Sequence, residues 1–328
     1  MVQRHALGSM LPSPWRWGAI RSVLLEPNRR VHVSFQHDMH QIIDAAQRSQ
    51  RFEARVAAID LLELCVLDRL AHLERQAALG AEQQLLRGRA TALRARLESA
   101  NERTLQRLAS RVRARRYTRA GLHRVLTRLS AAAVEHDYDA ADVLVAGLLD
   151  AGALPLERAS REPDMVAYQP TPARVVLSAL ELAAVDSDDV LIDLGSGLGW
   201  VVILTALLTG ARARGVEFEP VYCDYARACV NRLGLGSVEI MHADAREATL
   251  SDGTVFFMYT PFRGAMLDRV LERLRREAYA RTFRICAYGP CTKEVERADW
   301  LRARHQVGQG DETLGVFDSV SVFGAVER

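Results

Sequence analysis

The chain has 328 residues, enough for two domains, and its formal net charge at pH 7 is +2. Hydrophobic residues make up 49% and charged residues 26%, so there are enough apolar residues to bury real cores. No apolar run approaches the ~20 residues that a membrane-spanning helix needs. Pro12, Pro14 and Arg16 interrupt any signal-peptide core, and the five cysteines form no Cys-x-x-Cys pair, as expected of reduced thiols. We therefore predict a cytoplasmic protein without membrane contact.

Positive charge is concentrated in one segment. Lys293 is the only lysine, a bias towards arginine that is typical of GC-rich bacterial genomes. The segment Arg87–Arg128 has thirteen arginines against Glu98 and Glu102, a net charge of +11 in a chain of only +2. Such asymmetry indicates an acidic partner: nucleic acid, an acidic protein or anionic lipid. The alternatives are a solvated helix face, or arginines that pair with the chain's own acids. Tyr117 is the only aromatic residue in this segment, which argues against a protein that binds single-stranded nucleic acid by stacking on its bases.

The first half of the chain predicts an arm followed by helices. Residues 1–40 have scattered proline, tryptophan and arginine without a clear period, and we interpret them as an arm. Residues 41–155 have apolar positions at steps of three and four, which is typical of an all-helical domain and also offers a surface for a homodimer. His37 and His40 have no second ligand pair nearby, so no metal site is expected.

Four helices can be placed in this domain. One amphipathic pattern covers residues 59–77 and a second covers 93–112, with Gly80 expected to interrupt between them. Thr118 and Asp139 are the expected N-caps of a third and a fourth helix.

A strand, a tight turn and a helix organise the second half. Val190–Leu194 is a short apolar run, as expected of a strand buried on both faces of a parallel sheet. Gly195, Gly197 and Gly199 follow, and glycines at such a turn allow positive φ and close approach of a ligand. Their spacing differs from the Gly-x-Gly-x-x-Gly fingerprint of dinucleotide binding, which disfavours an NAD-dependent oxidoreductase.

Carboxylates follow the next two predicted strands. Glu217 lies at the end of the strand 214–218 and can accept hydrogen bonds from both hydroxyls of a ribose, with Glu219 as the alternative acid. Asp244 follows the strand 237–242 and, taken alone, would be interpreted as a helix cap. Open α/β sheets bind ligands beyond the carboxyl ends of their strands, so these acids and the glycine turn indicate one ligand site.

The remaining elements complete an α/β domain. Before the glycine turn, Thr171 is expected to cap a helix over 173–182 with Pro172 at its first position, and Tyr168 is a candidate to cover the site. After it, the predicted elements are a strand at 253–258, a helix at 266–278, a strand at 284–289 and a closing antiparallel hairpin of 313–317 with 319–323.

The pattern Asp193-x-Gly195-x-Gly197-x-Gly199 resembles motif I of the class I S-adenosylmethionine (SAM) methyltransferases. The resemblance implies a Rossmann-like, seven-stranded class I methyltransferase sheet preceded by the helical domain, with SAM as the cofactor. It assigns the ribose hydroxyls to the acid of the second strand and the adenine to the acid of the third. The cofactor-binding residues that it implies are Tyr168, Thr171, Asp193, Gly195, Gly197, Gly199, Glu217, Asp244 and Ala245.

A narrower resemblance covers about residues 165–280. Tyr168–Pro172, the segment 188–202 and Gly215–Glu217 are similar to the non-SET histone-lysine methyltransferases, the disruptor-of-telomeric-silencing family. That family has paired asparagines and aromatics after the fourth strand, where this chain has Tyr259 and Thr260. The resemblance therefore extends to the SAM site and not to a histone substrate.

We interpret residues 165–328 as a SAM-dependent methyltransferase domain whose acceptor is unidentified, with a protein side chain or a small molecule favoured. Tyr259 and Thr260 end the fourth strand, where class I enzymes meet their acceptor, and are the candidate catalytic residues. The alternatives are a nucleic-acid methyltransferase, or a SAM-binding scaffold whose arginine-rich helical domain binds nucleic acid.

Overall fold

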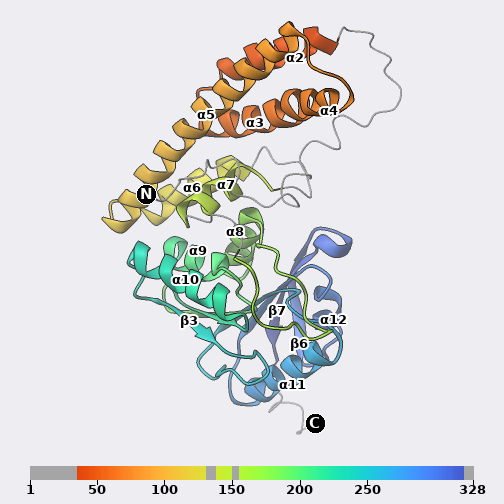
Figure 1. Cartoon of the computed structure of the whole chain (residues 1–328). Coiled ribbons are helices and arrows are strands. Elements are labelled where there is room, and N and C mark those ends of the chain that lie inside the picture. The colour runs from red at the N-terminus through yellow and green to blue at the C-terminus, as the bar shows by residue number, and fades with distance from the viewer. Residues whose placement is uncertain (1–34, 131–137, 150–154, 321–328) are drawn as a thin grey trace. The chain divides into compact units, whose positions relative to one another are not determined.

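The computed structural model describes residues 35–130, 138–149 and 155–320 (Figure 1). Most of the predicted arm, residues 1–40, lies outside the described residues. The first described helix begins at Phe35, six residues before the periodic pattern becomes clear in the sequence.

The chain divides into two compact units that alternate along the sequence. Among the described residues, 35–114, 128–130 and 138–149 form the first unit, and 115–127 and 155–320 form the second. The helix α6 (Arg119–Ser130) therefore belongs mostly to the second unit, whereas the sequence pattern places it with the other N-terminal helices. The longer segment of the second unit begins at Pro155, ten residues before the motif resemblance does.

The first unit is helical. Its described elements are α2 (Phe35–Gln47), α3 (Phe52–Leu62), the π-helical turn η3 (Glu63–Leu67), α4 (Asp68–Gln76), α5 (Ala81–Arg113) and α7 (Ala140–Leu148). Leucines 62, 70 and 86 are fully buried with Met39 and Ile43, so α2, α3, α4 and α5 share one core. The pattern at 59–77 thus spans α3, η3 and α4 as one run, because the π-turn inserts into the helix without ending it.

The interruption at Gly80 and the N-caps at Thr118 and Asp139 are confirmed, whereas α5 begins at Ala81, twelve residues before the pattern predicted over 93–112. Gly80 directly precedes α5 and has extended backbone angles. Thr118 Oγ1 accepts a hydrogen bond of 3.1 Å from the amide of Gly121 at the start of α6. Asp139 Oδ1 accepts one of 2.7 Å from the amide of Ala141 at the start of α7. Each cap satisfies a backbone amide that has no partner within its helix.

The second unit is built on a sheet of seven described strands. These are β1 (Val190–Leu194), β2 (Arg212–Glu217), β3 (Val238–His242), β4 (Val255–Tyr259), β5 (Arg284–Tyr288), β6 (Leu301–Val307) and β7 (Leu314–Ser319). Their order is β3-β2-β1-β4-β5-β7-β6, and β7 runs antiparallel to both of its neighbours. The order reverses between β1 and β4, so the carboxyl ends of β1, β2, β3 and β4 meet around one switch point.

Helices cover this sheet (Figure 1). They are α8 (Ala173–Leu182), α9 (Trp200–Leu208), α10 (Pro220–Leu233), α11 (Gly264–Ala280) and the short α12 (Thr292–Glu296), with the 3₁₀ turn η4 (Gly310–Glu312). Every residue of β1 is buried, as its apolar run predicts for a central strand. Alternate residues Val190, Ile192 and Leu194 join the core that contains Val270 and Leu274 of α11.

The predicted closing hairpin is misplaced by one strand. The segment 313–317 falls in β7, but its antiparallel partner is β6, upstream in the chain. The segment 319–323, predicted as the second strand, lies largely outside the described residues. Residues Arg302 to Val307 of β6 are all exposed at the sheet edge, so no alternation of apolar and polar residues marks this strand in the sequence.

Two further expectations can be compared with the structure. The five cysteines are buried free thiols. No helix within the described ranges combines the length and the apolar character that crossing a bilayer requires.

Candidate functional site

The glycine turn after β1 requires glycine at each of its three positions. Gly195, Gly197 and Gly199 have φ of 85°, 51° and 81°, the left-handed region that side chains disfavour. A Cβ on Gly195 would lie 2.3 Å from Pro261 Cβ, and one on Gly197 would lie 2.1 Å from the ring of Tyr168. The turn is therefore a cradle in which neighbouring chain segments approach the bare backbone.

The structure separates the two candidate acids after β2. The carboxylate of Glu217 accepts hydrogen bonds of 2.7 Å from the amides of Gly197 and Glu219, so it is held at the edge of the glycine turn. Burial raises its pKa despite these amide donors. Glu219 is buried and caps α10, and its other oxygen accepts from the amides of Arg158 and Ala159. Of the two acids, Glu217 is the one that adjoins the turn, and its role in binding ribose hydroxyls stays a prediction.

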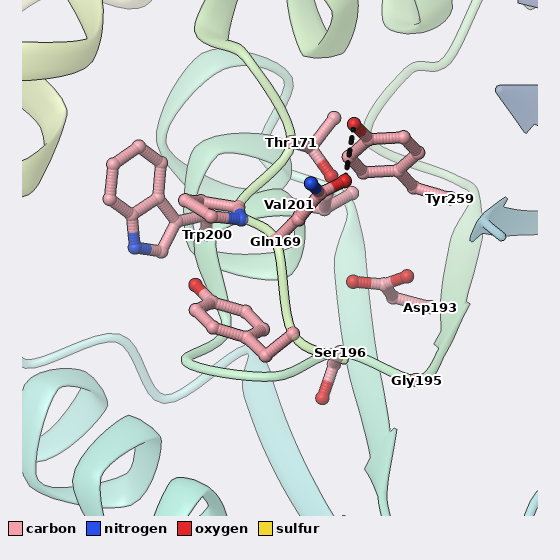
Figure 2. Close-up of a pocket in the computed structure, with 10 residues that line it drawn as sticks. Gln169, Thr171, Asp193, Gly195, Ser196, Trp200, Val201 and Tyr259 are labelled. Atoms are coloured by element: carbon pink, nitrogen blue, oxygen red, sulfur yellow. Dashed lines mark hydrogen bonds between the residues drawn. The ribbon is translucent and has the colours of Figure 1, made fainter. Parts of the chain in front are cut away.

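A pocket opens beside the glycine turn (Figure 2). The side chains that line it and matter below are Tyr168, Gln169, Thr171, Asp193, Trp200 and Tyr259. Asp193 comes from the end of β1 and is buried. Its burial raises its pKa well above the usual range of an aspartate, and the charge of Glu217 raises it further. The pocket thus joins the motif I carboxyl group to the end of β4.

Two buried polar atoms along this pocket have no hydrogen-bond partner among the described residues. They are the Ser196 hydroxyl oxygen and the Trp200 indole nitrogen. Both residues line the pocket. The Ser196 hydroxyl oxygen faces β2, because a Cβ on Gly215 would lie 2.5 Å from it. The glycine cradle and the Glu217 carboxylate beside it fit a molecule such as SAM, which has a ribose and charged amino-acid groups.

Asp244 lies at the end of β3 in an ion-pair cluster. Its Oδ2 lies 2.6 Å from Arg246 Nη2, and the same nitrogen lies 2.5 Å from Glu162 Oε1. Arg246 holds the pKa of Asp244 below its ordinary value. Asp244 Oδ1 also accepts a hydrogen bond of 2.7 Å from the amide of Arg246, so Asp244 stabilises the turn as a cap would. The carbonyl of Ala245 accepts from Arg273, and neither Asp244 nor Ala245 lines the pocket.

The two residues that end β4 differ in their surroundings. The hydroxyl of Tyr259 donates to Gln169 Oε1 at 3.2 Å, which Figure 2 marks with a dashed line, and its ring lies 4.8 Å from that of Tyr288. Burial raises the pKa of Tyr259 to about 12. Thr260 has φ of 35°, and its hydroxyl donates to the Tyr288 carbonyl and accepts the amide of Cys291. Tyr259 lines the pocket, whereas Thr260 braces the loop behind it.

A strap precedes α8 and is tied to the end of β4. The amide of Val166 donates to the carbonyl of Pro261 at 3.0 Å, and the amide of Arg263 donates to the carbonyl of Asp164 at 2.9 Å. The strap then places Tyr168 over the glycine turn. We refer to residues 164–171 as the strap.

The predicted helix cap in the strap is wrong. The residue before α8 is Pro172, and no side chain caps the helix there. Thr171 is instead buried and lines the pocket. Gln169, Ser196 and Trp200 were missed as site residues in the sequence. Gln169 directly follows Tyr168, and this position next to a predicted site residue is the one sequence signal for it.

The strand order, the glycine turn and the acid beside it define a class I SAM-dependent methyltransferase fold with SAM as its cofactor. A family model described as histone methylation protein DOT1 matches residues 166–234, which contain the strap, the turn and β2. Together these observations identify the second unit as a class I SAM methyltransferase domain.

Named relatives agree with this class. A protein-lysine N-methyltransferase of Saccharolobus islandicus (strain REY15A) is 35% identical over 96 residues, which are 29% of this chain and 60% of that protein. The chain thus spans less than two thirds of the length of this relative.

Two solved structures are also similar. An RNA methyltransferase of Salinibacter ruber, in complex with S-adenosylhomocysteine, has a TM-score of 0.41 and 29% identity, covering 46% of this chain and 94% of that one. The putative methyltransferase yhhF of Escherichia coli has a TM-score of 0.41 and 16% identity, covering 46% and 91%.

Proposed function

We propose that this protein transfers a methyl group from SAM to the side-chain amine of lysine in a protein. The observation that carries the proposal is a shared pocket: Asp193 and Gly195 of the cofactor turn line it together with Tyr259 at the end of β4. The name of the Saccharolobus islandicus relative supports lysine as the acceptor, and the description of the matching family, a histone methylation protein, supports a protein acceptor.

Bound SAM supplies an activated methyl group, and methyl transfer is an in-line displacement that depends mainly on alignment. The chain's own residues bind the cofactor and orient it. Glu217 and the glycine turn fix the ribose side, while Asp193 and Trp200 face the pocket beside it. Tyr168 closes over the turn and limits access of water.

The acceptor amine must be unprotonated when it attacks, and lysine has an ordinary pKa of about 10.4. A half-buried apolar wall lowers the pKa of an amine, because burial disfavours its charged form. Tyr259 and Tyr288 form such a wall. Because Tyr259 has a pKa of about 12, it stays a neutral phenol. Its donor hydrogen is directed at Gln169, so its oxygen lone pairs are available to accept an amine N–H and aim the nitrogen.

The test is transfer of tritiated methyl from SAM into three separated fractions of lysate: protein, RNA and small molecules. We expect label in protein, and methyl-lysine after acid hydrolysis. With SAM below its dissociation constant, Glu217→Ala should strongly reduce labelling, whereas Glu272→Gln, which changes an exposed glutamate of α11, should not.

The other outcomes separate the alternatives. Label only in RNA would replace the lysine proposal by nucleic-acid methylation. SAM binding without transfer to any fraction would favour a SAM-binding scaffold.

A further inference from the structure

The structure divides the arginine-rich helix α5 into two parts. In the first part the arginines are paired with acids of the neighbouring helices. The pairs are Arg87–Glu74, Arg89–Asp44 and Arg94–Glu63. These acids come from α4, α2 and η3, so this part of the positive charge is compensated within the helical unit.

The second part of α5 is different. Arg96, Arg103 and Arg107 are exposed, and within the described ranges no carboxylate pairs with any of them. The explanation that the arginines pair with the chain's own acids therefore accounts for the first part of the helix and not for Arg96, Arg103 and Arg107.

These three arginines share one face of α5. They are separated by seven and four residues, which at 100° per residue keeps them within about 40° of one another. With a rise of 1.5 Å per residue, they form a row about 16 Å long. Arg111 is exposed and continues the row by one further turn. Leu97 and Leu105 are buried on another face of the helix, so the core contacts do not cover the row of arginines.

A further positive group lies beside this row. Arg55 of α3 is held by Asn101 Oδ1 at 2.8 Å and by Thr104 Oγ1 at 3.1 Å, both on α5. Burial lowers the pKa of Arg55; the negative charge of Glu53 acts against this shift, and the positive charge of Arg103 adds to it. The contacts with α5 thus place the Arg55 guanidinium near Arg103, with Glu53 offsetting part of the positive charge.

We propose that the Arg96–Arg111 face of α5 binds the phosphate backbone of double-stranded nucleic acid without reading its sequence. Steps of about 6 and 10 Å between the arginines correspond to roughly every second or third phosphate, since one strand carries a charge per ~3.4 Å of axis. Guanidinium groups match phosphate oxygens in bidentate geometry.

Two features of α5 favour a duplex over the other anionic partners. The helix has no aromatic residue, so it offers nothing on which unpaired bases could stack. Its apolar face is buried in the helical core and is not available to enter a lipid surface. This proposal is independent of the acceptor of the methyl group.

The experiment measures binding of the full chain to a fluorescently labelled duplex of mixed sequence as salt rises. In B-DNA each neutralised phosphate contributes about 0.9 to the slope of log K against log salt. Three contacts therefore account for a slope of about 2.7, or an affinity loss of about 40-fold between 50 and 200 mM salt. The triple variant R96Q/R103Q/R107Q should lose this part of the slope.

The matched control removes the same charge from the second unit through R269Q/R276Q/R302Q, three exposed arginines, and should bind the duplex as the unchanged chain does. Helix content by far-ultraviolet circular dichroism and thermal unfolding are measured on every variant to establish that the helical unit is folded, and SAM binding is measured to establish the same for the second unit. If the glutamine variant is unfolded, R96K/R103K/R107K replaces it: the slope should persist while affinity falls, because lysine keeps the charge and loses the bidentate geometry.

Equal affinity and slope for the unchanged chain and a folded glutamine variant would overturn the proposal. So would a polyglutamate that competes as well as the duplex at equal charge concentration, because the partner would then be an acidic protein.

Discussion

Replacing Glu217 by alanine is the sharpest test of the cofactor site. The carboxylate now accepts two amide hydrogen bonds at 2.7 Å, one of them from Gly197 in the turn. The change removes both the acceptor expected to bind the ribose hydroxyls and a support of the turn itself. A hydrogen bond to a charged group contributes about 1.5–3 kcal/mol, so affinity for SAM should fall roughly 10- to 150-fold.

Isothermal titration calorimetry with SAM and with S-adenosylhomocysteine measures this loss directly. Glu272→Gln serves as the control, because Glu272 is exposed on α11 and pairs only with Arg276 among the described residues. The two ligands should be affected alike, since both have the same ribose. Unchanged affinity in a folded Glu217→Ala variant would refute the assignment of Glu217 to the site.

Three further predictions concern the pocket. Tyr259→Phe should lower turnover on the true acceptor while SAM affinity in calorimetry stays nearly constant; an equal loss of both would place Tyr259 in cofactor binding instead. Asp193→Asn should raise the melting temperature at neutral pH. A raised folded pKa means that the unfolded chain ionises first, so the wild type loses stability as pH rises above the ordinary value of 3.8. The difference in melting temperature between the variant and the wild type should vanish below that pH. A difference that stays constant with pH would contradict a raised pKa of the buried Asp193 carboxyl group. Gly197→Ala should lower the free energy of unfolding by more than the ~1–2 kcal/mol of a left-handed backbone, because its Cβ also meets Tyr168. Tyr168→Ala should recover part of that loss in denaturant titrations, and no recovery would mean that backbone strain alone causes it.

The central sheet could be predicted because burial leaves a mark in the sequence. β1 and β4 are buried along nearly their whole length and have apolar runs, whereas β6 is exposed and has none. The same reasoning explains α6. Its amphipathic period indicates a helix but does not say which core its apolar face joins, and contacts place most of it with the second unit.

The sequence predicted which residue types would stand at the site, but not the hydrogen-bond partners of each side chain. Glu217 and Glu219 stand two positions apart and have the same chemistry, and only the structure shows that Glu219 is occupied as a cap. Trp200 follows Gly199 and begins an apolar helix, so its sequence context is that of a core residue. Thr260 is polar and ends β4 as expected, yet its hydroxyl is engaged with backbone groups that no local pattern encodes.

The cap on α10 also determines where an independent fragment of this domain can start. Glu219 receives amides from Arg158 and Ala159, and Tyr222 donates its hydroxyl to Glu157 at 2.9 Å. A fragment cut at Met165, where the recognisable motifs begin, would lose the Arg158 and Ala159 amides and leave the buried Glu219 carboxylate with the amide of Val221. A fragment of the methyltransferase domain therefore needs at least the eight or so residues upstream that no motif marks, in addition to α6, most of which belongs to the same unit.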